Sequence, residues 1–175
     1  SFFKTHRVRS TNLIEKQVFT SSGTTGQRPS KHLIHDLSVY IESFTRAFSL
    51  VYGSSNNYCI LALLPSYSER SGSSLIYMVE DLISKSNHKK SGFYLNNHNE
   101  LHSTLLELQK ENQKTILIGV SFALLDFIEN HQLQWNDLIV METGGMKGRR
   151  KEMIRSDLHE ELKSGFGVDQ IHSEY

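Results

Sequence analysis

The sequence predicts an α/β fold: a mostly parallel sheet flanked by helices, with a β-hairpin that carries a loop rich in Gly, Ser and Thr. Continuous apolar runs at residues 58–64, 115–120 and 138–141 are typical of strands buried on both faces of a sheet. Amphipathic segments with helical spacing separate these runs. Because strands and helices that alternate in this way form parallel sheets covered by helices, the order of the elements indicates the fold class.

The remaining elements follow from local signals. Short strand-like segments at 18–19 and 32–35 enclose the Gly/Ser/Thr loop and predict the hairpin. Asp36 or Ser38 is expected to cap a helix that runs to Tyr52 and stops at Gly53, and the last helix is expected to end at Gly165. Further helices are expected over about 73–85, 100–111, 121–130 and 156–163, and short strands over 93–95 and 170–173.

Composition limits the class of protein. The 175 residues suit one domain spanning 1–175, and Lys+Arg 19 balances Asp+Glu 19, so no overall field favours nucleic acid. No apolar run approaches the length of a membrane span. The single cysteine suits a reducing, cytoplasmic setting, and its place inside an apolar run makes Cys59 an inert buried thiol. We expect His102, His131 and His159 on helix surfaces and no metal ligand in this chain.

The Gly/Ser/Thr loop has the chemistry of a phosphate-binding site. Hydroxyl groups and glycine-exposed backbone N–H groups hold phosphate oxygens, and a lysine at the edge adds a positive charge. The G-x-x-x-x-G-K spacing fails, because the sixth position from the first glycine is Arg28. A solvated surface loop remains the alternative. The predicted phosphate-binding residues are Ser21, Ser22, Gly23, Thr24, Thr25, Gly26 and Lys31.

Ligands of parallel sheets bind beyond the carboxyl ends of the strands, and this rule selects three further stretches. The candidate ligand-binding residues of these stretches are Tyr67, Gly144, Gly145, Met146, Ser173, Glu174 and Tyr175. Paired glycines let a flat ring or a carboxylate approach the backbone. The alternatives are a turn tyrosine and a solvated strand end.

These stretches, in this order, resemble the AMP-forming adenylating enzymes, the acyl-CoA synthetase and ligase superfamily. Residues 22–26 match the first part of its phosphate loop, S-G-T-T-G-x-P-K, while Pro29 and Lys31 are slightly displaced. The chain looks most like the acyl-protein synthetase branch, which includes the bioluminescence fatty-acid synthetase; phenylacetate-CoA ligases are near relatives. The resemblance implies that the glycine pair lines adenine and the acyl carboxylate, that Tyr67 borders the acyl pocket, and that Tyr175 packs on adenine.

The resemblance also implies an activity. A carboxylic acid, most simply a fatty acid, would react with ATP and Mg²⁺ to give acyl-AMP and pyrophosphate, and the acyl group would pass to a thiol of a protein or of CoA. The chain would be a core fragment of the large N-terminal domain, inactive alone, with the catalytic lysine outside it. A noncatalytic nucleotide- or acyl-binding module and a plain α/β interaction domain are the alternatives.

Overall fold

The computed structural model describes residues 2–8, 14–21, 29–65, 72–144, 146 and 149–174. The chain forms two compact units, the first made of Ser1–Ser55 and Ser66–Leu82 and the second of Asn56–Pro65 and Ile83–Tyr175. A short 3-10 turn, η1 (Ser55–Asn57), and helix α3 (Ser74–Ser86) run across the boundaries between these units. That residues 1–175 form a single domain stays a prediction.

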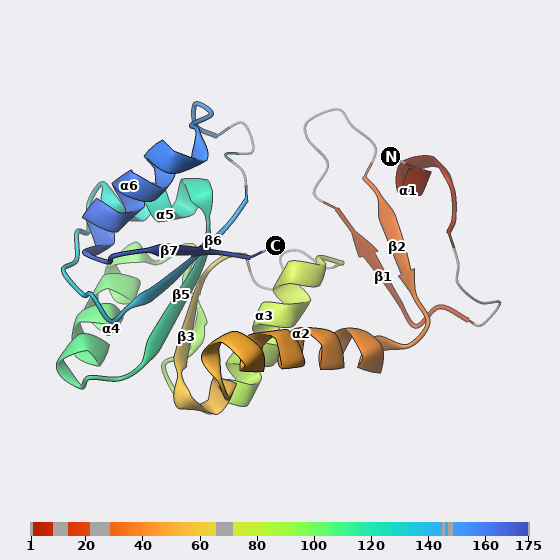
Figure 1. Ribbon diagram of the computed structural model, residues 1–175, viewed down its shortest axis with the longest axis horizontal. Coiled ribbons are helices and arrows are strands. Elements are labelled where there is room, and N and C mark those ends of the chain that lie inside the picture. The colour runs from red at the N-terminus through yellow and green to blue at the C-terminus, as the bar shows by residue number, and fades with distance from the viewer. Residues whose placement is uncertain are drawn as a thin grey trace. The chain divides into compact units, whose positions relative to one another are not determined.

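The second unit contains a five-stranded parallel sheet in the order β4-β3-β5-β6-β7 (Figure 1). Every residue of β3 and β5 is buried, as the apolar runs predicted. Together with the hairpin of the first unit, this sheet confirms the predicted fold class. The strands are β3 (Cys59–Leu63), β4 (Gly92–Phe93), β5 (Thr115–Val120), β6 (Ile139–Thr143) and β7 (Ile171–Ser173).

Three helices, α4 (His98–Lys110), α5 (Ser121–Ile128) and α6 (Arg155–Phe166), lie on the same side of this sheet (Figure 1). The rings of Phe127 and Phe166 stack with their centroids 5.8 Å apart and join α5 to α6. Both rings are fully buried, so they form the centre of this layer. No helix among the described residues is long and apolar enough to cross a membrane.

The end of α6 differs from the prediction. The helix continues through Gly165 to Phe166, and Gly167 ends it in the left-handed region with φ 66°. Gly165 instead serves packing, since a Cβ there would lie 2.7 Å from the Cβ of Ile128 on α5. Glycine is favoured both where two helices pack closely and where a helix ends in the left-handed region. The sequence alone therefore did not show which of the two glycines ends α6.

The first unit contains the antiparallel hairpin of β1 (Gln17–Thr20) and β2 (Lys31–Ile34), with α1 (Phe2–Thr5) and α2 (Leu37–Tyr52). As predicted, Asp36 caps α2, accepting the backbone N–H of Ser38, and Gly53 with φ 79° follows its end. The ring of Phe19 on β1 lies 5.2 Å from that of Tyr40 on α2, so aromatic packing holds the hairpin against the helix.

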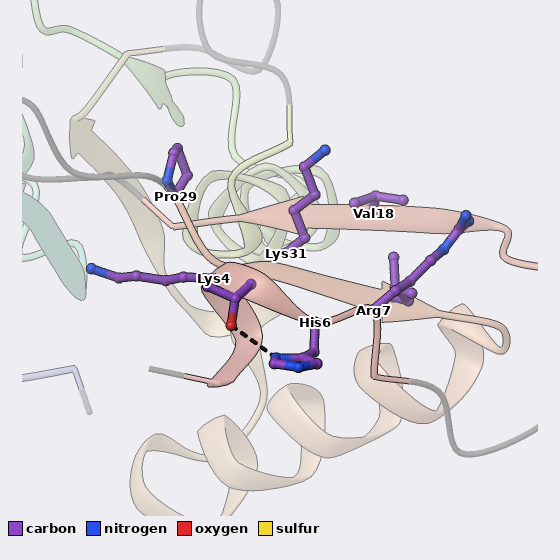
Figure 2. A pocket seen from close by; sticks show the side chains of 8 residues that line it. Lys4, His6, Arg7, Val18, Pro29 and Lys31 are labelled. Carbon is purple, nitrogen blue, oxygen red and sulfur yellow. Dashed lines mark hydrogen bonds between the residues drawn. The ribbon is translucent and has the colours of Figure 1, made fainter.

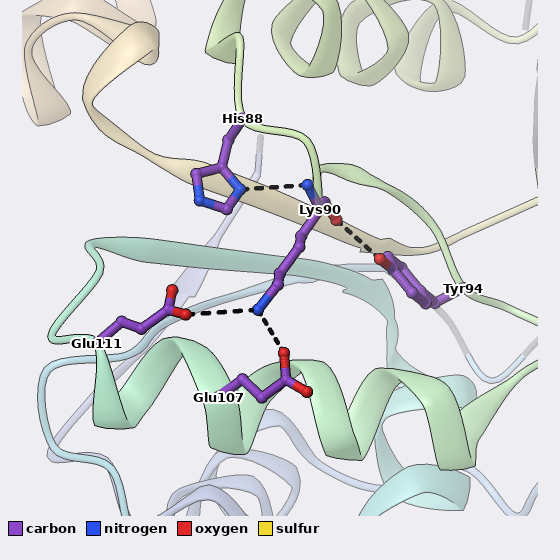
Figure 3. A network of polar contacts seen from close by, with 5 residues as sticks. All are labelled: His88, Lys90, Tyr94, Glu107 and Glu111. Atoms are coloured by element: carbon purple, nitrogen blue, oxygen red, sulfur yellow. Dashed lines mark hydrogen bonds and ion pairs between the residues drawn. The ribbon is translucent and has the colours of Figure 1, made fainter.

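A polar network fixes the segment before β4 to α4 (Figure 3). Lys90 Nζ lies 2.5 Å from Glu107 Oε2 and 3.8 Å from Glu111 Oε1. The hydrogen bond to Glu107 raises the pKa of Lys90, and the same bond lowers the pKa of Glu107. The hydroxyl of Tyr94 donates to the Lys90 carbonyl at 2.8 Å, which orders the chain as it leaves β4. Because both carboxylates are solvent-exposed, the network orients the segment more than it stabilises the fold.

Candidate functional site

The carboxyl ends of β6 and β7 lie side by side. Glu142 pairs with Ser173 in the sheet register, and the backbone N–H of Glu174 donates to the Glu142 carbonyl at 3.1 Å. Gly144, which is exposed, directly follows β6. Two of the three stretches that the sequence selected therefore meet at one edge of the sheet, where parallel α/β sheets bind ligands.

Glu142 is the centre of a buried polar cluster at this edge. Its side chain is 3% exposed, and the Ser121 hydroxyl, at the start of α5, donates to Glu142 Oε1 at 2.5 Å. His159 on α6 places its Nε2 3.9 Å from Glu142 Oε2. A buried carboxylate requires such partners, because its desolvation is otherwise costly. The cluster thus ties the end of β6 to both helices above it.

The sheet register explains why these groups meet. Gly119, Glu142 and Ser173 occupy one row across β5, β6 and β7, so their side-chain positions share a face of the sheet. A Cβ at Gly119 would lie 2.7 Å from Leu124 Cγ, which shows that this is the face covered by α5. The missing side chain at Gly119 lets α5 come close enough for Ser121 to reach Glu142.

Two buried atoms of the cluster lack hydrogen bonds. Ser173 Oγ and His159 Nε2 are inaccessible to solvent and have no hydrogen-bond partner among the described residues. Buried polar atoms of this kind usually bind an ordered water or a polar group of a ligand. The edge beside Glu142 can therefore accept one more polar group.

Burial disfavours charge at residues 172 and 174. It lowers the pKa of His172 and raises the pKa of Glu174. His172 lies one residue before Ser173 and so occupies the opposite face of the sheet, where Gln170 Nε2 is 2.8 Å from its Nε2. Burial of Glu174 thus favours the neutral form of a carboxyl group at the edge that is expected to receive an anionic ligand.

The hairpin of the first unit holds the predicted phosphate loop between its strands. Thr20 pairs with Lys31 at the end of the hairpin that leads into this loop. Ser21 closes the neck of the loop, because its N–H donates to the Ser30 carbonyl at 3.1 Å and its Oγ accepts the Ser30 N–H at 2.9 Å. The hairpin prediction is confirmed, whereas residues 22–28 lie outside the described residues.

A cavity of about 480 Å³ lies against this hairpin and is lined in part by Lys31 (Figure 2). Lys4 and Arg7 also line it, together with apolar side chains such as Leu33. Figure 2 shows the charged ends of Lys4, Arg7 and Lys31 pointing away from one another. Arg7 also forms an ion pair with Glu15. The cations therefore do not converge on one small anion in this arrangement.

No protein-family model matches the chain, and no curated protein matches it. Among solved structures, the chain is similar to ATP-bound MatB from Rhodopseudomonas palustris, with a TM-score of 0.57 and 14% sequence identity. The match covers 90% of this chain and 28% of the MatB chain. The chain thus spans less than a third of that protein, and at this identity the likeness shows a shared fold.

The predicted residues fall into distinct groups. Ser173 and Glu174 lie beside Glu142 at the carboxyl ends of β6 and β7, and Gly144 directly follows β6. Met146 is 2% exposed, so its side chain is buried, and Lys31 is exposed on β2 in the other unit. The binding roles of all these residues stay predictions. Eight further residues with predicted binding roles lie outside the described residues: Ser22, Gly23, Thr24, Thr25, Gly26, Tyr67, Gly145 and Tyr175.

Sequence reasoning missed the cluster of Ser121, Glu142 and His159. The predicted strand ended at Met141, but β6 continues to Thr143, so Glu142 is a buried strand residue and not part of a turn. The expected surface position of His159 is also wrong, since its side chain is 22% exposed and faces Glu142. The only local signal for the cluster was the position of the charged Glu142 directly after an apolar run. The partners of Glu142 come from α5 and α6, which precede and follow β6 in the sequence.

Proposed function

We propose that this chain is the nucleotide-binding part of an enzyme that activates a carboxylic acid, most simply a fatty acid, with ATP and transfers the acyl group to a thiol. The observation that carries the proposal is the meeting of Gly144 with Ser173 and Glu174 at the carboxyl ends of neighbouring strands. The proposed role of that edge in binding a nucleotide rests on the resemblance of these stretches and of loop 22–26 to the adenylating enzymes. The fold shared with ATP-bound MatB supports a nucleotide as the ligand.

The reaction has two balanced steps. A carboxylate oxygen attacks the α-phosphorus of ATP, the bond from that phosphorus to the bridging oxygen breaks, and pyrophosphate leaves. A thiolate then attacks the acyl carbon and AMP leaves, giving a thioester. In this chain, Thr24 and Thr25 would hold the phosphates of the leaving group, and the β6–β7 edge would hold the AMP part. The contribution of these residues is positioning and charge stabilisation.

Magnesium is expected from the resemblance, but the proposal assigns it no ligand here. Within the described ranges, no group of three or more His, Cys, Asp or Glu side chains is arranged to hold a metal ion.

Nucleotide binding by the 175-residue chain tests the proposal. We expect saturable ATP binding by calorimetry, which Thr24→Val and Thr25→Val each weaken roughly ten- to a hundredfold, because each removes a hydroxyl bonded to a charged oxygen. Thr45→Val on α2 is the matched control and should bind ATP like the unchanged chain. Thermal melting verifies that each variant is folded. A folded chain that binds no ATP, or equal binding by all variants, would contradict the proposal.

An experiment that identifies the acyl acceptor requires the longer protein that the resemblance implies. Incubated with ATP and a labelled fatty acid, that protein should carry hydroxylamine-sensitive label on a cysteine if it is an acyl-protein synthetase. Rapid acyl-CoA formation without protein label would instead assign it to the CoA ligases. The 175-residue chain alone should give no carboxylate-dependent exchange of pyrophosphate into ATP, because the catalytic lysine is expected outside it.

A further inference from the structure

Three imidazole rings gather around Phe127 in the second unit. His98 and His102 lie four residues apart on α4, so they share one face of that helix, and His131 follows α5. The ring centroids of His102 and His131 are 4.9 Å apart. The Phe127 centroid lies 5.2 Å from that of His131, 5.7 Å from that of His98 and 6.3 Å from that of His102.

These rings have no counter-charge. Among the described residues, no hydrogen bond or ion pair reaches the imidazoles of His98, His102 or His131, which make ring contacts alone. Burial lowers the pKa of His131, and the neighbouring His102 and His98 lower it further. No carboxylate contributes to that shift.

The nearby charged side chains are occupied elsewhere. Asp126 on α5 and Glu129, which follows that helix, both pair with Arg150. On α4, Glu100 accepts a hydrogen bond from the amide of Asn97 at 2.5 Å. On α6, Lys163 Nζ lies 2.5 Å from Glu160 Oε1. Among the described residues, no ion pair reaches these three imidazoles to offset the positive charge that protonation would add.

The spacing of His98 and His102 on a helix is also typical of metal ligands. In the described part of the chain, however, no group of three is arranged to hold a metal ion. The ring planes of His102 and His131 are inclined to each other by 34° with their centroids 4.9 Å apart, so the two imidazoles lie in ring contact. We therefore consider protonation of these imidazoles, and not metal binding.

We propose that His98, His102 and His131 form a proton-responsive contact, whose protonation loosens the packing of α4 against the end of α5. A single charged imidazole over Phe127 gains some cation–π attraction. A second charge less than 5 Å away opposes it, and burial disfavours charge on His131. Because the folded state then binds protons less readily than the unfolded state, the free energy of unfolding falls as pH drops below the ordinary histidine pKa.

The test follows His131 by NMR and stability by urea unfolding, with a chelator present so that metal binding does not contribute. We expect His131 to titrate below the ordinary pKa of about 6.5 and to move towards it in His102→Gln. The urea midpoint of the unchanged chain should fall between pH 7.5 and 5.5, and His102→Gln should reduce this fall. His172, whose pKa burial also lowers, contributes equally to both proteins.

The matched control is His35→Gln in the first unit, which should lose stability on acidification as much as the unchanged chain does. Where His102→Gln does not fold, His98→Gln provides the same comparison, because His98 also lowers the pKa of His131. An unaltered His131 titration in a folded variant, or equal acid sensitivity of variant and unchanged chain, would overturn the proposal.

Discussion

Cys59 shows how a strand environment controls the chemistry of one residue. The residue is fully buried in β3, and burial raises the pKa of its thiol to about 11. The hydroxyl of Ser91, 3.7 Å from the sulfur, lowers the pKa less than burial raises it. Because the thiolate is the nucleophile, Cys59 is unsuited to accept an acyl group. An acceptor cysteine, if the proposed enzyme uses one, must lie elsewhere in a longer protein.

This environment predicts slow chemical modification. At pH 8 a thiol with a pKa of about 11 is ionised to roughly one part in a thousand, and burial also blocks the reagent. We therefore expect Cys59 to react with a disulfide reagent at least a hundredfold more slowly in the native chain than in urea. Both rates are measured from the thiolate that the reagent releases as it reacts with Cys59. Native modification as fast as that of a free thiol would contradict the buried position of β3.

At the scale of an element, α6 depends on its close contact with α5. A Cβ added at Gly165 would lie 2.7 Å from the Cβ and Cδ1 of Ile128, which is too close without a shift of one helix. Helix propensity alone favours alanine over glycine by about 1 kcal/mol. The packing cost of an oversized side chain in a core, about 1–3 kcal/mol, opposes that gain.

We expect packing to outweigh propensity, so Gly165→Ala should lower the free energy of unfolding by about 1–2 kcal/mol in urea titrations. Ser164→Ala, at the exposed neighbouring position, is the matched control, and its stability should equal or slightly exceed that of the unchanged chain. A more stable Gly165→Ala variant would mean that α5 and α6 do not approach so closely.

At the scale of the whole molecule, the two compact units share continuous chain. The boundary between Leu82 and Ile83 falls inside α3, so the loss of one unit removes part of a helix that also belongs to the other. Unfolding in one unit is therefore expected to propagate to the other. This is the behaviour of the single domain that the sequence predicts.

The single tryptophan, Trp135, tests this expectation because it lies in the second unit and is 7% exposed. We expect its fluorescence and the far-ultraviolet circular dichroism of the whole chain to give the same urea midpoint, as a two-state transition requires. Separate midpoints would establish two independently unfolding units.

The sequence alone determined the main strands and helices of the fold, though not the ends of β6 and α6 or the short helix α1. The apolar run at 115–120 is β5, and Asp36 and Gly53 bound α2 as predicted, because burial on both faces and helix capping leave local signals. The alternation of strands and helices was enough to predict a mostly parallel sheet. The short last strand expected over 170–173 is β7 (Ile171–Ser173), so Ser173 ends this strand and Glu174 follows it.

The tertiary structure alone decided which distant residues meet. Ser121, Glu142 and His159 form one cluster because the sheet register and the missing side chain at Gly119 bring α5 close to β6. Likewise, His131 approaches His102 through the packing of α4 on α5 around Phe127. Hydrophobic periodicity reports the environment of a segment within a few residues. Register and helix approach depend on side chains far apart in the chain, so the polar contacts they create have no local pattern.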